Sequence, residues 1–247
     1  MQNKYVGDIG DYGKYGLLRD LFSSDHKLGI IWYLVPDERH VNDGRYIDYL
    51  SKNRFQDCDS ELFLILKNIV SLNRRNITAI ERSKMFSDRT NFYSEILTYN
   101  NIQGNTPAGR QKRLELREQW LRGALETATN CDAIFLDPDN GLETPSVQKH
   151  FRKAPKYVYY NEVERFLSST KTLIVYHHFN RKRTHHSQIE QRKKTLQDIS
   201  KSHEILSLRF WPYSPRVYFI LTRQSDVIDR VNIFANSEWR QCFELHT

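Results

Sequence analysis

The sequence predicts an α/β fold, a doubly wound and mostly parallel sheet that ends in an antiparallel hairpin. Short apolar runs alternate with longer amphipathic stretches, which is the pattern of βα units. The last two apolar runs are separated only by residues 211–215, too few for a parallel crossover, so these strands should pair antiparallel. A chain of 247 residues can bury a full core, and no repeat or Gly/Ser linker marks a boundary. We therefore expect a single domain over residues 1–247.

Each expected strand is a short apolar run, and each expected helix is a longer amphipathic stretch. In chain order, the strands are expected at 29–35, 76–81, 132–136, 172–176, 204–210 and 216–222. The helices are expected at 14–22, 60–70, 110–128, 162–167, 187–200 and 226–235. Residues 86–113 are polar and rich in Asn, Thr and Gly, so this segment is expected to be a mobile loop or a small insertion.

The composition favours a nucleic-acid partner and a reducing compartment. The formal net charge is +7, which attracts anions, and the 13% of aromatic residues supply either base-stacking surfaces or core. Cys58, Cys131 and Cys242 are scattered and odd in number, which supports neither a disulfide framework nor a zinc site. The first residues hold no apolar signal core, and no apolar run is long enough to cross a bilayer. We therefore expect a cytoplasmic protein without a membrane partner, and the sequence leaves its oligomeric state open.

The most informative segment is 134–143, Ile-Phe-Leu-Asp-Pro-Asp-Asn-Gly-Leu-Glu. A buried strand that breaks into Asp-Pro and Asn-Gly places Asp137, Asp139, Asn140 and Glu143 at its carboxyl end. Ligands bind at this end in open α/β sheets, although the same residue types also form ordinary turns. Three carboxylates this close repel one another and persist mainly where a site uses them. Asp137, Asp139 and Asn140 are therefore candidate catalytic residues, and Glu143 is a candidate substrate contact.

A second candidate segment lies near the start of the chain, where residues 7–19 hold four glycines between charged side chains. Glycines at this density let a backbone approach a ligand closely or adopt positive φ, and Lys14 then lies in the first turn of a helix. The segment lacks the Gly-Lys-Ser/Thr of a phosphate-binding loop. Asp8, Asp11, Lys14 and Tyr15 are candidate substrate contacts, and the alternative is an irregular N-terminal arm.

The crossover after the first strand is rich in carboxylates rather than in glycine. It holds Asp37 and Glu38, and then Asp43 and Arg45. A nucleotide-binding Rossmann unit carries glycines at this place so that its backbone can reach the cofactor. These side chains are candidate substrate contacts, although the Asp-Gly pair at 43–44 is also an ordinary turn.

Two histidines follow another expected strand, which ends at Tyr176. Sheet order should bring this end beside Asp137, so His177 or His178 is a candidate acid, base or phosphate contact. Adjacent strand residues point to opposite faces, so at most one of the two should face the site.

A basic stretch follows these histidines and leads into the next helix. Arg181, Lys182 and Arg183 are followed by three more basic residues at 192–194, with only Glu190 opposing them. Such a run can neutralise phosphates along a strand of nucleic acid, and charge runs are also common on solvated faces. Its place directly after the expected site makes Arg181, Lys182 and Arg183 candidate substrate contacts.

With these residues in hand, the chain resembles, over most of its length, class I methyltransferases that modify an adenine amine in large-subunit ribosomal RNA. Those proteins begin with a Gly-rich segment similar to 7–18, with Asp11 and Lys14 in matching places. They carry Asp-Pro-Pro-Tyr where this chain has Asp-Pro-Asp-Asn at 137–140, and a tyrosine-ended strand similar to 173–176. The resemblance implies a Rossmann-like sheet ending in an antiparallel hairpin, a base taken out of its stack, and S-adenosylmethionine as cofactor.

The chain departs from that family where methyl transfer takes place. The family's aromatic residue that stacks on the target base is replaced by Asn140, and its glycine-rich cofactor loop is replaced by Pro-Asp-Glu at 36–38. We therefore expect an enzyme that acts on an extruded base by hydrolysis of the N-glycosidic bond, with neither a cofactor nor a metal.

In this reaction, positive charge develops on the sugar and a carboxylate stabilises it while a base activates water. Asp137 or Asp139 would supply the carboxylate. Asn140 would orient water or hold a base edge, and His177 or His178 would contact phosphate or the departing base.

Three other interpretations stay open. The chain could be an S-adenosylmethionine-dependent adenine methyltransferase of DNA or RNA, a nuclease that holds magnesium with the same carboxylates, or a non-catalytic nucleic-acid-binding protein. DNA is favoured over RNA as the partner. The residues do not choose between repair and defence against foreign DNA.

Overall fold

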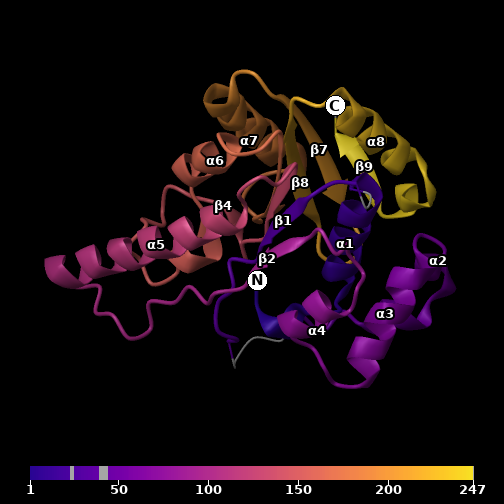
Figure 1. The fold of residues 1–247 in the computed structure, drawn as a ribbon, viewed down its shortest axis with the longest axis horizontal. Coiled ribbons are helices and arrows are strands. Elements are labelled where there is room, and N and C mark those ends of the chain that lie inside the picture. Colours follow the sequence, from indigo (N-terminus) through magenta and orange to yellow (C-terminus); the bar gives the residue numbers. More distant parts are fainter. Residues whose placement is uncertain (23–24, 39–43, 247) are drawn as a thin grey trace.

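A mostly parallel seven-stranded sheet forms the centre of the molecule (Figure 1). The computed structural model describes residues 1–22, 25–38 and 44–246. The order of strands in the sheet is β2-β1-β3-β6-β8-β7-β9; β2, β1, β3 and β6 run parallel, and β8, β7 and β9 are antiparallel to their neighbours. Strands β4 and β5 form a separate parallel pair. The bounds are β1 Leu28–Ile31, β2 Asn91–Tyr93, β3 Ala133–Leu136, β4 Gly141–Leu142, β5 Tyr157–Val158, β6 Thr172–His178, β7 Glu204–Phe210, β8 Arg216–Thr222 and β9 Phe243–His246.

Helices cover both faces of this sheet, as expected for a doubly wound, Rossmann-like fold (Figure 1). Helices α1, α3 and α8 lie on one face, and α5, α6 and α7 lie on the other. Their bounds, with those of the shorter helices, are α1 Ile9–Leu21, α2 Asn53–Gln56, α3 Ser60–Ser71, α4 Ile77–Arg82, α5 Pro107–Thr127, α6 Tyr160–Leu167, α7 His185–Ser200 and α8 Ser225–Asn236. The 3-10 helices are η1 Asn3–Tyr5, η2 Asp48–Ser51, η3 Ala154–Lys156 and η4 Glu238–Gln241.

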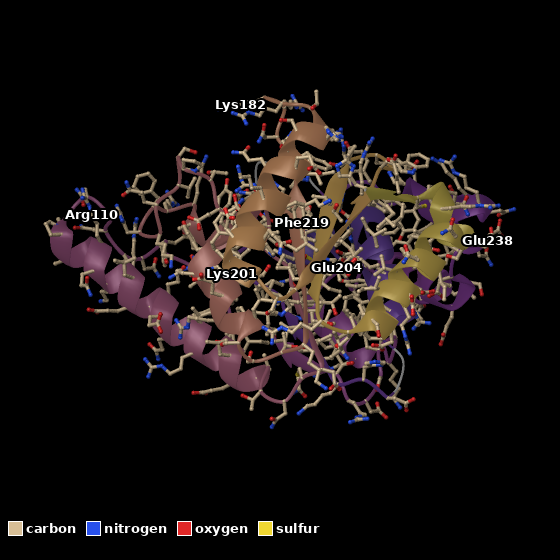
Figure 2. The ribbon with its side chains drawn as sticks, turned by 90° about the horizontal axis from the view of Figure 1, so that it is seen from above. Arg110, Lys182, Lys201, Glu204, Phe219 and Glu238 are labelled. Atoms are coloured by element: carbon tan, nitrogen blue, oxygen red, sulfur yellow. The ribbon has the colours of Figure 1, made fainter. Side chains whose placement is uncertain are left out.

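The two hydrophobic cores follow from the alternation of side chains along the strands. In β3, Ala133 and Phe135 point to the core beneath α1 and α8, whereas Ile134 and Leu136 point to the core beneath α5 and α6. Every residue of this strand is buried, which explains its continuous apolar run. Seen from above, α7 and α8 flank the sheet, and Phe219 of β8 lies between them (Figure 2).

The predicted fold class is confirmed, and most elements lie where they were expected. The strands predicted at 204–210 and 216–222 match β7 and β8, which pair antiparallel. The strand predicted at 76–81 is wrong, because this segment forms α4. Asn76 caps that helix by accepting a hydrogen bond from the Ala79 N–H at 2.9 Å, and the buried Ile77 and Ile80 follow helical spacing.

Residues expected to form a mobile loop or insertion contribute to the sheet instead. Asn91–Tyr93, within 86–113, is β2, the edge strand that pairs with β1. Pro107 begins α5, which Thr106 caps. The strand was not predicted, because the segment is polar and the strand has only three residues.

The Gly-rich N-terminal segment is a helix and not an irregular arm, and α1 begins five residues before the predicted start at residue 14. Asp8 caps it by accepting a hydrogen bond from the Asp11 N–H at 2.9 Å. Gly10, Gly13 and Gly16 recur every third residue, and each lets the helix pack closely against another side chain. Gly10 and Gly13 face Arg216 and Phe210 of the sheet, where a Cβ at Gly13 would lie 2.4 Å from the Phe210 ring, and Gly16 faces Trp239 of η4.

No helix in the described part of the chain is long and apolar enough to span a membrane.

Candidate functional site

A cavity of about 310 Å³ opens at the carboxyl ends of β3 and β6. At this edge of the sheet, the connection after β1 leads to β2 on one side, and the connection after β2 leads to β3 on the other side. Ligands bind at such a point in open α/β sheets. Its lining combines carboxylates, cations and tyrosines: Met1, Tyr5, Asp8, Asp11, Lys14, Gly44, Tyr46, Asp137, Pro138, Asp139, Asn140, Tyr176, His178, Arg181, Ser214 and Arg216. Two segments predicted separately from the sequence, 7–19 and 134–143, therefore meet at one site.

Lys14 joins these two segments through buried ion pairs. Its Nζ lies 2.8 Å from Asp11 Oδ1 and 2.7 Å from Asp137 Oδ2. Burial favours the neutral amine, but the two carboxylates outweigh it and raise the pKa of Lys14 above its usual value. Burial raises the pKa of Asp137, against the opposing effect of Lys14. Tyr15 donates its hydroxyl to Asp11 Oδ2 at 2.9 Å, so it supports the network and does not line the cavity.

Among the residues that the structure describes, Asp139 has partners at one carboxylate oxygen only. Its Oδ2 accepts a hydrogen bond from Gln2 Nε2 at 2.9 Å and lies 3.1 Å from Lys156 Nζ. Its Oδ1 is buried and has no hydrogen-bond partner among the described residues. Burial alone would raise the pKa of Asp139, but the amino group of Met1 and Lys156 outweigh it, and the pKa is lowered. Asp139 is therefore an ionised carboxylate with one oxygen that no described residue contacts through a hydrogen bond.

Asp8 lies in the same cavity, and its pKa is raised whereas that of Asp139 is lowered. Burial, and then the nearby charge of Asp11, raise the pKa of Asp8 to about 6, although Arg216 acts against them. The Asp8 carboxyl can therefore gain and lose a proton near neutral pH, which general acid–base catalysis requires.

The first two residues lie across the crevice between β1 and β3. The Met1 amine donates to Tyr33 O at 3.1 Å and to Asp137 O at 3.2 Å, and Val35 N–H donates to Met1 O at 3.0 Å. Gln2 Oε1 accepts a hydrogen bond from Glu38 N–H at 2.9 Å. In nucleotide-binding Rossmann proteins this crevice receives the cofactor.

The structure brings one of the two histidines to the site. His178 lines the cavity, and the prediction that at most one would do so is confirmed. His177 points to the other face of the sheet, where its Nδ1 accepts a hydrogen bond from Leu142 N–H at 3.1 Å. Burial, and then Arg192, lower the pKa of His177 to about 3, so its ring is neutral. The expectation that His177 could serve as an acid, a base or a phosphate contact is therefore wrong.

Three predicted contacts have other partners outside the cavity. Glu143 Oε1 accepts a hydrogen bond from Tyr160 N–H at 2.8 Å, at the first residue of α6. Asp37 Oδ1 accepts from Lys4 N–H at 3.3 Å, and Glu38 Oε2 lies 2.7 Å from Lys156 Nζ. Glu38 therefore contacts the same lysine as Asp139 but does not line the cavity.

The remaining predicted contacts are basic and exposed, or lie outside the described residues. Arg45 is exposed beside Tyr46, and Arg181 is exposed and lines the cavity. Lys182 and Arg183 are exposed in the loop before α7, and Lys182 lies at the periphery of the molecule (Figure 2). Asp43 lies outside the described residues.

Eight lining residues were not predicted as site residues: Met1, Tyr5, Gly44, Tyr46, Pro138, Tyr176, Ser214 and Arg216. Arg216 pairs with His178 in the antiparallel register of β6 and β8. The predicted hairpin could have indicated that Arg216 lies near the site, because an antiparallel strand beside β6 begins at the edge where β6 ends.

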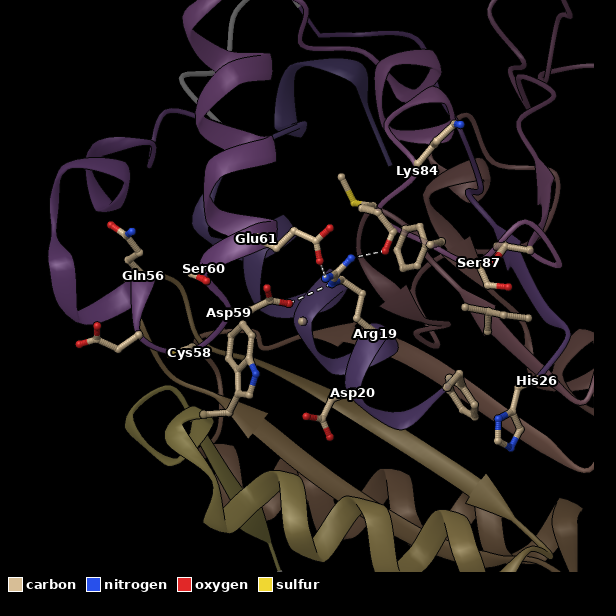
Figure 3. A pocket seen from close by; sticks show the side chains of 18 residues that line it. Arg19, Asp20, His26, Gln56, Cys58, Asp59, Ser60, Glu61, Lys84 and Ser87 are labelled. Carbon is tan, nitrogen blue, oxygen red and sulfur yellow. Dashed lines mark hydrogen bonds and ion pairs between the residues drawn. The ribbon is translucent and has the colours of Figure 1, made fainter. Parts of the chain in front are cut away.

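A larger cavity, of about 870 Å³, lies beside α1 and α3 and contains no predicted site residue (Figure 3). Its charged groups are partly paired with each other: Arg19 lies 2.9 Å from Asp59 Oδ2 and 2.6 Å from Glu61 Oε2.

In the described part of the chain, no group of three or more His, Cys, Asp or Glu side chains is arranged to hold a metal ion. Between Asp11 and Asp137, the ammonium of Lys14 lies where a cation bound by these two carboxylates would lie. Neither a protein-family model nor a curated protein matches this chain.

Proposed function

We propose that this chain is a nucleic-acid enzyme that hydrolyses the N-glycosidic bond of an extruded nucleotide, with Asp8 as general acid and Asp139 as the carboxylate facing the sugar. One observation carries the proposal. Two carboxyl groups of one cavity have pKa values shifted in opposite directions, that of Asp8 to about 6 and that of Asp139 downward. Environments that separate two carboxyl groups in this way typically assign one to proton donation and the other to charge stabilisation.

The reaction uses a protonated Asp8 and an ionised Asp139. Protonated Asp8 gives its proton to the leaving nitrogen of the base while the bond from this nitrogen to the sugar C1′ breaks. The positive charge that develops on the sugar is stabilised by ionised Asp139. Water then forms the new bond to C1′ and gives its proton to a carboxylate, which returns it to solvent. The sequence predicts Asp137 or Asp139 in this role, and the ion pair of Asp137 with Lys14 leaves Asp139 as the better candidate.

The lining of the cavity suits an extruded nucleotide. Tyr5, Tyr46 and Tyr176 supply aromatic faces on which a base can stack. Asn140 supplies an amide for a base edge, and the exposed Arg181 at the cavity can contact a phosphate of the backbone. The volume, about 310 Å³, is near the lower limit for ligand pockets and suits one nucleotide rather than a folded segment.

An adenine methyltransferase remains the second candidate, because the parallel sheet with an antiparallel end is the one that the resemblance implies. The position of residues 1–2 argues against it, since they fill the crevice that a nucleotide cofactor would enter. Isothermal titration with S-adenosylmethionine separates the two functions. Micromolar binding would favour methyl transfer.

The test of hydrolysis is release of free base. The protein is incubated with modified and unmodified DNA and RNA, without added cofactor, and released bases are identified by mass spectrometry. We expect free base and an alkali-sensitive abasic site in at least one substrate, also in the presence of a chelator. Intact polymer under all of these conditions would refute the proposal. Polymer that gains mass only with S-adenosylmethionine would establish the second candidate.

A further inference from the structure

Arg216 is a buried cation at the cavity that the proposed chemistry does not use. It is 9% exposed and begins β8 at the edge where β6 ends. Its Nε donates to Ser214 O at 3.0 Å. The guanidinium is packed between two rings, with its Cζ 5.9 Å from the centroid of Tyr176 and 5.6 Å from that of Phe210. The side chain is therefore fixed in position and orientation.

The two terminal nitrogens of this guanidinium have no hydrogen bond and no ion pair with any residue in 1–22, 25–38 or 44–246. Asp8 influences Arg216 electrostatically but forms no ion pair with it within 4.0 Å. A buried charge without a paired counter-charge is costly, and buried cations are normally paired. The two free nitrogens therefore lack the anion that would offset this cost.

Helix α1 makes room for this guanidinium through a missing side chain. A Cβ at Gly10 would lie 1.6 Å from Arg216 Nη1 and 2.4 Å from Cζ, so any residue except glycine would displace the group. Gly10 lies in the first turn of α1, directly after Asp8 and Ile9. The position of the guanidinium is thus defined by the sheet on one side and by the α1 backbone on the other.

We propose that Arg216 binds the phosphate attached to the target sugar, so that the substrate of this cavity is a nucleotide and not a nucleoside. The planar fork of an arginine matches two phosphate oxygens. His178 and Arg181 line the same cavity and add positive charge or hydrogen-bond donors for the other oxygens. The inference rests on the proposed function for the identity of the sugar and base, whereas anion binding by Arg216 does not depend on hydrolysis.

The experiment measures binding by isothermal titration in the full chain, under conditions without turnover. The probes are inorganic phosphate, the four deoxynucleoside 5′-monophosphates, the four matching nucleosides and a single-stranded oligonucleotide. R216M removes the charge and keeps an apolar stem. G10A keeps the charge and displaces the guanidinium. R209M is the matched control, because Arg209 has the same charge on the neighbouring strand, is paired with Glu244 and lies outside the cavity.

We expect a monophosphate to bind at least about tenfold more tightly than its nucleoside, since hydrogen bonds to a charged group are worth this factor or more. R216M and G10A should abolish this difference, and R209M should keep it. Binding of the monophosphates alone would identify a free nucleotide as the source of the phosphate, and binding of the oligonucleotide would identify a nucleic-acid strand. Circular dichroism and thermal melting establish that each variant is folded.

Wild-type affinity for monophosphates in R216M would overturn the inference, as would equal affinity of the wild type for nucleosides and monophosphates. Acetate that competes as well as phosphate would also overturn it, because the site would then be a general carboxylate site. Absence of base release from a protein that still binds monophosphates through Arg216 would refute the proposed hydrolysis alone.

Discussion

Lys14 and Asp137 form a buried ion pair, with Lys14 Nζ and Asp137 Oδ2 2.7 Å apart. One residue belongs to the N-terminal helix α1 and the other directly follows the central strand β3. The pair therefore fixes the position of α1 over the carboxyl edge of the sheet, and with it the position of the α1 N-cap, Asp8.

Replacement of Lys14 by methionine should strongly destabilise the protein. K14M keeps most of the side-chain volume but leaves the carboxyl groups of Asp11 and Asp137 buried without their cation. Loss of one partner of a buried ion pair typically costs about 3–5 kcal/mol. Urea denaturation measures the free energy of unfolding. R165M removes an arginine from a half-exposed pair with Glu118 and should cost about 0–1 kcal/mol. Equal costs for the two variants would contradict the structural role of Lys14.

Replacement of Asp139 by asparagine should reduce base release while the chain stays folded. D139N keeps the shape of the side chain and an acceptor for Gln2, and removes the negative charge that faces the cavity. Loss of a group that stabilises developing charge costs about 100- to 1000-fold in kcat. Initial rates of base release under saturating substrate measure the effect. D198N, which removes the charge of an exposed aspartate on α7, should retain the wild-type rate.

Acid should destabilise the protein partly through His177. The folded-state pKa of His177 is lowered to about 3, whereas the unfolded value is 6.5. As the pH falls from 6.5 towards 3, the unfolded chain takes up a proton at this group and the folded chain does not, so stability falls. The loss is about 1.4 kcal/mol for each pH unit. H177N keeps an acceptor for Leu142 N–H and cannot take up this proton. Urea titrations at pH 7 and pH 5 should therefore show a smaller loss in H177N than in the wild type; equal losses would mean that His177 titrates normally.

A methyl group at Gly13 should push α1 away from the sheet. The Cβ of G13A would lie 2.4 Å from the Phe210 ring, which is buried and cannot move freely. Overpacking of this kind costs about 1–3 kcal/mol, even though alanine is the better helix former. In an F210A background the same substitution should cost little, because the ring is gone. A double-mutant cycle in urea measures this difference. Additive costs would show that Gly13 and Phe210 do not determine the packing.

The sequence predicted those parts of the fold that hydrophobic periodicity determines. Strands β7 and β8 matched to the residue, because β7 alternates buried and more exposed residues, β8 is a continuous buried run, and a short turn joins them. Strand β2 was missed, because its three residues are only partly buried and derive their conformation from pairing with β1. The segment at 76–81 was assigned to a strand from its apolar residues, although Asn76 is a residue type that favours a helix N-cap.

The candidate site was predictable in part, including its carboxylates, Lys14, His178 and Arg181. Asp137, Asp139 and Asn140 follow a recognisable strand, and Asp8, Asp11 and Lys14 stand in a recognisable segment. Gly7 adopts positive φ, one of the two roles expected for these glycines. Gly10, Gly13 and Gly16 instead let α1 pack closely against other side chains, and glycines that serve packing have the same local pattern as glycines that serve a ligand loop. Arg216 and the tyrosines enter the cavity through tertiary contacts between segments far apart in the chain, which local patterns do not report.

The pH dependence of base release is the decisive measurement, because it depends on the protonation state of the Asp8 carboxyl group. The Asp8 carboxyl has a pKa of about 6, so above that pH it loses the proton that it must donate. For the wild type, kcat/KM should be constant below about pH 6 and should fall about tenfold for each pH unit above it. D8N keeps a good helix cap but cannot donate this proton, so its residual rate should lack this decline. The same decline in D8N, or a wild-type rate that does not change between pH 5 and pH 8, would contradict the assignment of Asp8 as the acid.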